Sequence, residues 1–173
     1  MAIQHMKTAL VAGLLALVTL PAWAVCNADM VPSKPSTLLS DRGDGTVYDE
    51  ETGLMWMKCS QGQSGDDCGT GTASTFTWAA ALAEAQTANA GTGTNGYTDW
   101  RVPSVAELAS LVETSCENPA ISTTYFPATL SGYYWSSSPS VAADNSAWRV
   151  LFAAGEESTS TKDSTHYVRL VRH

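Results

Sequence analysis

The hydrophobic positions in the first half of the chain follow a helical period. In the alanine-rich stretch over residues 75–89, apolar residues recur at the spacing of one helix face, at Trp78, Leu82 and Ala85. Thr77 is a suitable N-cap for this stretch, and the glycine-rich sequence over residues 90–96 is typical of a loop. The pattern therefore predicts a first helix over residues 75–89.

A second helix is predicted a few residues later by its start signal. Ser104 and Glu107 have the S-x-x-E spacing of a capping box, in which each side chain satisfies a free backbone amide of the other residue. One apolar face follows, made by Val105, Leu108, Leu111 and Val112. We expect this helix to end at about Thr114.

The second half of the chain changes to the alternating period of strands. Strands are predicted over residues 133–138, 147–152 and 166–172. In the second of these, one face carries Trp148, Val150 and Phe152. The polar stretch over residues 155–163 is interpreted as a long turn or a solvated edge strand.

Three shorter strands are predicted ahead of these. A Gly/Asp hairpin turn leads into a strand within residues 41–49, an apolar strand covers residues 54–57, and another covers residues 99–102. Helices in the first half and antiparallel strands in the second indicate an α+β fold rather than alternating βαβ units.

The first 24 residues have the three parts of a secretory signal. A lysine-bearing start precedes the apolar run Thr8–Leu20, and Ala22-Trp23-Ala24 supplies small residues for cleavage. This run is too short to span a bilayer as a helix. Val25 in front of Cys26 argues against a lipoprotein, in which a small residue normally precedes the cysteine. We therefore expect a signal peptide over 1–24, a tail over 25–40 and one domain over 41–173, exported to the periplasm, cell surface or medium.

Four cysteines in an exported chain favour disulfides over a metal site. Three pairings are open. Cys59 and Cys68 bracket an all-polar loop that a local bridge would hold, which leaves Cys26 to pair with Cys116. No C-x-x-C pair is present in the sequence, so a zinc site is not expected.

The charge balance excludes one class of partner. The sequence has 17 acidic and 9 basic residues, and removal of the signal would leave a net charge of −9. A nucleic-acid-binding protein needs a basic face that displaces counterions from phosphates, so we expect no nucleic-acid partner.

Four motifs in order resemble the C-terminal domain family of the Legionella collagen-like protein. They are GTVYDEETGLMW from Gly45, GYTDWRVPSVAEL from Gly96, NPAISTTYFP from Asn118 with YWSSSP from Tyr134, and VRLVR from Val168. The resemblance covers about Asp41–Arg172, and the pairing of an early cysteine with Cys116 is also similar to members of this family. The stretch RVPSVAEL is similar, more distantly, to the formylglycine-generating enzymes.

The resemblance implies a C-type lectin-like fold with two helices, a twisted, mostly antiparallel sheet and long loops. It also implies recognition of sulfated glycosaminoglycans by a positive surface. Only three basic residues follow Arg149, namely Lys162, Arg169 and Arg172, so the charge argues against that ligand here. The cysteine pair used late in the chain by formylglycine-generating enzymes has no counterpart after Cys116.

Several side chains were weighed as binding candidates. Asp41, Asp44 and Asp49 lack the spacing of a calcium loop and are interpreted as turn residues; Asp66 and Asp67 are interpreted as solvated charge. Among the aromatics Tyr133, Tyr134, Trp135 and Trp148, the two tryptophans are expected in the core and Tyr133 at the surface. Arg101, Arg149 and Arg169 could form an anion site, but pairing with acids such as Asp99 or Glu107 is favoured.

These observations predict a binding or adhesion module and not an enzyme. His166 has no triad partners in sequence, and no G-x-S-x-G or phosphate loop occurs. The ligand, a glycan or a protein on a surface, would be bound by loops at residues 62–72, 91–97 and 141–146, with Tyr133 and Arg149 as candidate contacts. No metal or cofactor is expected. The alternative is a structural or assembly subunit of a surface fibre or secretion system.

Overall fold

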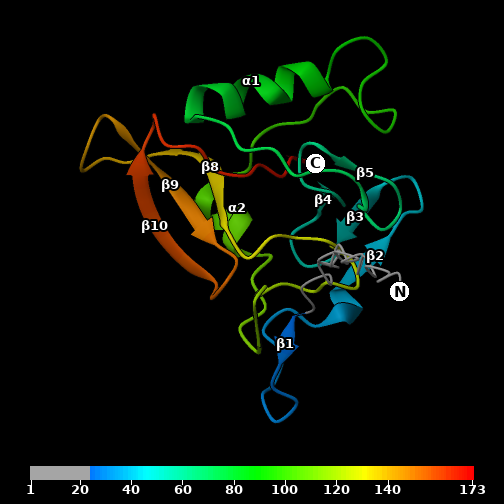
Figure 1. Ribbon diagram of the computed structural model, residues 1–173. Coiled ribbons are helices and arrows are strands. Elements are labelled where there is room, and N and C mark those ends of the chain that lie inside the picture. Colours follow the sequence, from blue (N-terminus) through cyan, green and yellow to red (C-terminus); the bar gives the residue numbers. More distant parts are fainter. Residues whose placement is uncertain (1–23) are drawn as a thin grey trace, which may run out of the picture.

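The computed structural model describes residues 24–173, and the signal peptide predicted over residues 1–24 lies outside these residues except for Ala24. The architecture is α+β, with two helices and four antiparallel sheets. In Figure 1 the two larger sheets lie on either side of the red C-terminal segment, and α1 crosses above them. Among the described residues, no helix is long and apolar enough to cross a membrane.

The strands predicted in the second half form a three-stranded antiparallel sheet. Its members, in the spatial order β10-β9-β8, are β8 (Tyr133–Pro139), β9 (Ser146–Leu151) and β10 (Glu156–Thr161). The polar stretch over residues 155–163 is thus an edge strand and not a long turn. Its alternating polar residues suit this position because only one of its edges is hydrogen-bonded.

The second sheet has four strands and joins the two ends of the domain. Its order is β11-β4-β3-β2, with β2 (Leu39–Asp41), β3 (Thr46–Asp49), β4 (Leu54–Met57) and β11 (Val171–Arg172). The strand predicted over residues 166–172 enters this sheet only at its last two residues.

The rest of that C-terminal segment lies between the sheets. Single bridges connect His166 to Phe76, Tyr167 to Tyr134 of β8, and Val171 to Arg101. Arg101 makes only this isolated bridge, so the strand predicted over residues 99–102 is not formed. The aromatic and apolar residues of the C-terminal segment therefore contact both sheets.

The two helices lie where the sequence places them, but one is shorter than predicted. Helix α1 spans Trp78–Ala88 and is capped by Thr77, whose hydroxyl accepts from the amide of Ala80. Helix α2 spans only Val105–Ala109, and both hydrogen bonds of its predicted capping box are present. It ends early because the amides of Leu111 and Val112 bond three residues back, in tighter turns than those of an α-helix.

The hydrophobic core has two clusters, one on each face of β8. Tyr134 packs with Val150, Phe152 and the leucines that follow Ser104, whereas Trp135 packs with Ala147 and the alanines of α1. Trp135 is fully buried, as predicted. Trp148 was also expected in the core but is only half-buried. The irregular pairing of β8 beyond Trp135 lies opposite Trp148 and interrupts the regular alternation there.

Residues 25–40, expected to form a tail, are built into the fold. Strand β1 (Val25–Cys26) pairs with β7 (Cys116–Glu117), and the Cys26–Cys116 disulfide joins them. A 3-10 turn, η1 (Ser36–Leu38), then leads into β2. The buried Lys34 makes an ion pair with the buried Asp49, with the ammonium nitrogen 2.7 Å from a carboxylate oxygen.

Glu113 fixes the same segment from the other side. Its carboxylate accepts from the amides of Ser33, Lys34 and Ser115. Burial works to raise the pKa of Glu113, but these hydrogen bonds outweigh it and lower the pKa. The segment around Lys34 is thus held by three carboxylates, because the Lys34 ammonium also pairs with the exposed Glu51 at 2.7 Å.

Candidate functional site

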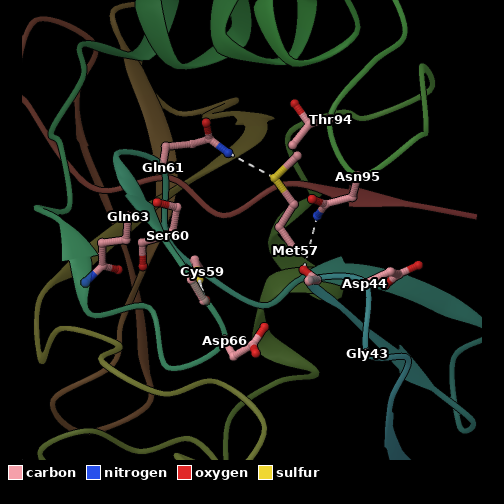
Figure 2. Close-up of a pocket in the computed structure, with 13 residues that line it drawn as sticks. Gly43, Asp44, Met57, Cys59, Ser60, Gln61, Gln63, Asp66, Thr94 and Asn95 are labelled. Carbon is pink, nitrogen blue, oxygen red and sulfur yellow. Dashed lines mark hydrogen bonds between the residues drawn. The ribbon is translucent and has the colours of Figure 1, made fainter.

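Three loops enclose a polar groove of about 310 Å³ beside the four-stranded sheet. The loops are the β2–β3 turn around Asp44, the segment from the end of β4 through β5 (Gln63–Ser64), and the loop at Thr94 and Asn95 (Figure 2). Two of the three loops expected to bind a ligand, residues 62–72 and 91–97, therefore contribute to one groove. The third, residues 141–146, does not line it.

The β2–β3 turn and the loop at Asn95 are tied together across the groove. Asn95 donates from its amide to the carbonyl oxygen of Gly45 at 3.2 Å, as the dashed line in Figure 2 shows. A side chain at position 45 would approach the Asn95 amide to 3.0 Å, and Gly45 also has a positive φ of 85°. Only glycine combines this backbone conformation with this close approach.

Asp44 shapes the same corner through its carboxylate. One oxygen accepts from the amide and hydroxyl of Thr46, and the other accepts from the hydroxyl of Tyr97 at 3.2 Å. Thr94 is fixed in turn, because its hydroxyl donates to the carbonyl of Ala88 at the end of α1. The turn, the loop and the helix end thus form one hydrogen-bonded unit.

The Cys59–Cys68 disulfide closes the third loop on itself. Inside it, β5 pairs with β6 (Thr70–Gly71). The backbones approach closely here because Gly62 and Gly71 have no side chain. A Cβ atom at either position would lie 2.4 Å from a backbone oxygen of the other arm of the hairpin. The outcome is a short, tethered hairpin that presents Ser64 and Asp66 to the groove.

A buried arginine supports the groove from beneath. Arg169 is fully buried and donates to the carbonyl oxygens of Met57 and Lys58 and to the hydroxyl of Thr129. Burial lowers its pKa to about 10. Its guanidinium contacts only uncharged oxygens, so the expected pairing of Arg169 with an acid is wrong.

The side chains that line the groove are mostly polar, and the charged ones are all negative. Its lining contains two carboxylates, three side-chain amides, three hydroxyls and the apolar Met57, and it contains no lysine, arginine or histidine. In the described part of the chain, Asp66 and Ser64 make no side-chain hydrogen bond and are exposed. Free acceptors without a cation suit hydroxyl or ammonium donors on a ligand and disfavour anions.

The other acidic candidates already have partners of their own. Asp41 pairs with Lys58, and the hydrogen bond from Lys58 and that from the Gly43 amide lower the pKa of Asp41. Asp49 pairs with Lys34. Asp41 and Asp44 also accept from backbone amides two residues ahead, which is the geometry of the turns predicted for them. No group of three or more possible metal ligands occurs within residues 24–173.

Tyr133 and Arg149 lie together, away from the groove. The guanidinium carbon of Arg149 is 3.5 Å from the centroid of the Tyr133 ring, and the guanidinium also contacts His166 at 2.9 Å. Burial, and then the charge of Arg149, lower the pKa of His166 to about 4, so the imidazole is neutral at pH 7. Arg149 therefore makes no ion pair with an acid in residues 24–173, unlike the expected arrangement.

The remaining arginine candidate is paired as expected. Arg101 binds Glu107 through two hydrogen bonds of 2.7 and 2.6 Å. The hydrogen bonds from Arg101 lower the pKa of Glu107 to about 2. Of the three arginines, only Arg149 lies beside another candidate ligand contact, Tyr133. The three arginines do not come together in one anion site.

Sequence reasoning placed Gln63 within a predicted binding loop but missed Ser60 and Gln61, which lie just ahead of that loop. Their polar side chains gave no signal of their own within an all-polar loop. The available signal was indirect. Glycines with positive φ lie in each of the three loops, at positions 43 and 45, 62 and 65, and 93 and 96.

The comparison with protein families gives one result. A family model described as the Lcl C-terminal domain matches residues 45–172. This match includes all three groove loops except the residues just before Gly45. No curated protein matches the chain.

Proposed function

The chain belongs to the Lcl C-terminal domain family, and from this premise we propose that it is an exported, non-enzymatic binding module whose loops hold a ligand in the polar groove. The two disulfides are consistent with an oxidising compartment outside the cytoplasm. We further propose a C-type lectin-like arrangement for its α+β fold, with presentation at the bacterial surface or in the periplasm.

Binding is favoured over catalysis by the surroundings of the groove carboxylates. Asp44 is committed to Thr46 and Tyr97, and the groove lining offers no imidazole, amine or thiol as a partner for Asp66. His166, at the start of the C-terminal segment, contacts Arg149 instead. A catalytic nucleophile or base is usually activated by an adjacent titratable group, and the lining supplies none besides Asp44.

The ligand class follows from the donors and acceptors of the groove. Hydroxyl, amide and carboxylate groups suit a neutral or amino sugar, whose hydroxyls can donate to the carboxylates and accept from the amides. A sulfated ligand would meet Asp44 and Asp66 without a compensating cation. The absence of cations from the lining is the observation that carries this choice.

A glycan array tests the proposal directly. Residues 25–173, produced with both disulfides formed, should bind neutral or amino glycans in preference to sulfated ones. Asp66→Ala should weaken binding about tenfold, since one charged hydrogen bond contributes roughly 1.5 kcal/mol. Asp67→Ala is the matched control, because the adjacent Asp67 is exposed but does not line the groove.

Two outcomes would overturn the proposal. One is silence across glycans, matrix proteins and whole cells. The other is binding that is strongest for sulfated glycans and unaffected by Asp66→Ala.

A further inference from the structure

Strand β10 has one free edge, and we propose that this edge pairs with β10 of a second copy of the chain. The strand is outermost in its sheet and pairs with β9 over six consecutive residues without a register shift. In Figure 1, no helix or strand of residues 24–173 lies alongside its outer edge. Its sequence, EESTST, lacks the proline, bulge or central lysine that blocks pairing at exposed edges.

The hydrogen bonds to β9 show which backbone groups face outward. Lys162 donates its amide to the carbonyl of Asn145, in the same register that pairs Ser158 with Arg149. Hydrogen-bonded and non-hydrogen-bonded residues alternate along an antiparallel strand. The even-numbered residues therefore bond to β9, and the amides of Glu157, Thr159 and Thr161 point away from the sheet. The carbonyls of Glu157 and Thr159 also face outward, whereas the Thr161 carbonyl accepts from the amide of Ser164.

This alternation of inward- and outward-facing backbone groups allows the β10 strands of two copies to pair symmetrically. With Thr159 on a two-fold axis, Thr159 faces Thr159 of the second copy, and Glu157 faces Thr161 of the second copy. Thr159 then exchanges two hydrogen bonds with Thr159 of the second copy, and each Thr161 amide donates to the Glu157 carbonyl of the other copy. A C2 contact of this kind is self-complementary, which is the commonest symmetry of homo-oligomers.

The same register also matches the charges. It places Glu156 opposite Lys162 of the second copy, and symmetry repeats this pair at the other end. Both are non-hydrogen-bonded positions, where facing side chains are closest. The register centred on Glu157 instead would place two carboxylates against each other, and the one centred on Thr161 would leave Glu156 without a facing residue of β10.

Within residues 24–173, neither Glu156 nor Lys162 makes an ion pair. Glu156 is exposed. The Lys162 ammonium contacts the carbonyl of Asp144 and lies 4.7 Å from the centroid of the Trp78 ring. That contact keeps the lysine near the end of β10, where Glu156 of the second copy would lie.

The dimer would be a continuous six-stranded sheet with two grooves. Pairing of one strand buries little area compared with a stable interface, so association would depend on concentration. Independently of which ligand the groove takes, two grooves in one assembly would raise the avidity for a repetitive surface.

Charge-reversed variants test the pairing. Glu156→Lys alone and Lys162→Glu alone place like charges at both ends of the contact, so each should weaken dimerisation about tenfold or more in sedimentation equilibrium. An equimolar mixture of the two variants should form heterodimers, because each lysine then faces a glutamate. Native mass spectrometry distinguishes the heterodimer from either homodimer.

A second variant keeps the test independent of the side chains. Thr159→Pro removes one outward amide and leaves the bonds to β9 in place, so it should remove the dimer without loss of the folded circular dichroism spectrum. Hydrogen exchange should show that dimer formation protects the amides of Thr159 and Thr161. A wild-type chain that stays monomeric at millimolar concentration, or a mixture that associates no better than its components, would overturn the proposal.

Discussion

The buried ion pair between Lys34 and Asp49 allows a sharp stability prediction. The side chains are 2% and 0% exposed, and the ammonium lies 2.8 and 2.7 Å from the two carboxylate oxygens. Lys34→Met would leave Asp49 charged, buried and without its cation. Breaking a buried pair in this way costs about 3–5 kcal/mol.

That cost is a large share of the stability expected for one domain, which is roughly 5–15 kcal/mol. At about 2–4 °C per kcal/mol for a domain of this size, the midpoint of thermal unfolding should fall by roughly 6–20 °C. Urea unfolding at pH 7, followed by tryptophan fluorescence, measures the free energy directly.

Lys58→Met is the matched control. Lys58 pairs with Asp41 at a similar distance, but the Asp41 side chain is 41% exposed and stays hydrated when the lysine is removed. Its loss should cost about 1 kcal/mol. Adding Asp49→Asn to Lys34→Met should recover part of the loss, since the amide is neutral. Its oxygen can still accept from the Glu51 amide, and its NH2 group can donate to the Thr52 hydroxyl oxygen. Equal costs for the two lysines, or no recovery, would refute the reasoning.

Three further predictions concern pH and the disulfides. Glu107→Gln should lower the free energy of unfolding by about 1–2 kcal/mol at pH 7, allowing for partial exposure of the pair. Because the folded pKa of about 2 lies below the ordinary 4.5, the stability difference between wild type and variant should shrink as pH falls from 4.5 toward 2. Urea melts that show a constant difference over this range would contradict the prediction. The low pKa of His166, about 4, means that the unfolded chain binds the proton more tightly; stability should therefore fall as pH drops from 6.5 to 4, and His166→Gln should reduce that fall in thermal melts. Replacing both cysteines of the Cys26–Cys116 bridge by alanine should cost about 4.6 kcal/mol, against about 2.7 kcal/mol for the Cys59–Cys68 bridge, since the two close loops of very different length; equal losses in urea unfolding would argue against the loop-entropy explanation.

Local signals predicted local structure well. The capping box at Ser104 and Glu107 and the cap at Thr77 depend on neighbouring residues only, so the sequence was enough to locate both helix starts. The early end of α2 comes with the tighter turns at Leu111 and Val112, and beyond them the Glu113 amide bonds to the carbonyl of Ala120 outside the helix. Periodicity carries no information about such a contact.

The groove was only partly predictable for the same reason. Loop composition pointed to residues 62–72 and 91–97, but the approach of Asn95 to Gly45 spans fifty residues. The partner of Arg169 was predicted wrongly because burial among carbonyl oxygens satisfies a guanidinium as a carboxylate would, and sequence spacing cannot distinguish them. The Lys34–Asp49 pair was missed because a charge in a proline-containing stretch suggests solvent exposure.

The C-terminal segment between the two sheets determines when this domain can close. His166, Tyr167 and Val171 bridge to Phe76, Tyr134 and Arg101, and β11 completes the sheet that begins at β2. The residues that join the sheets thus follow every helix and every other strand of the domain. A growing chain that does not yet contain them has neither cluster of its core complete, so we expect this domain to close only after they are made. Late closure of this kind would keep the polypeptide in a form that can be threaded through a membrane channel before it folds.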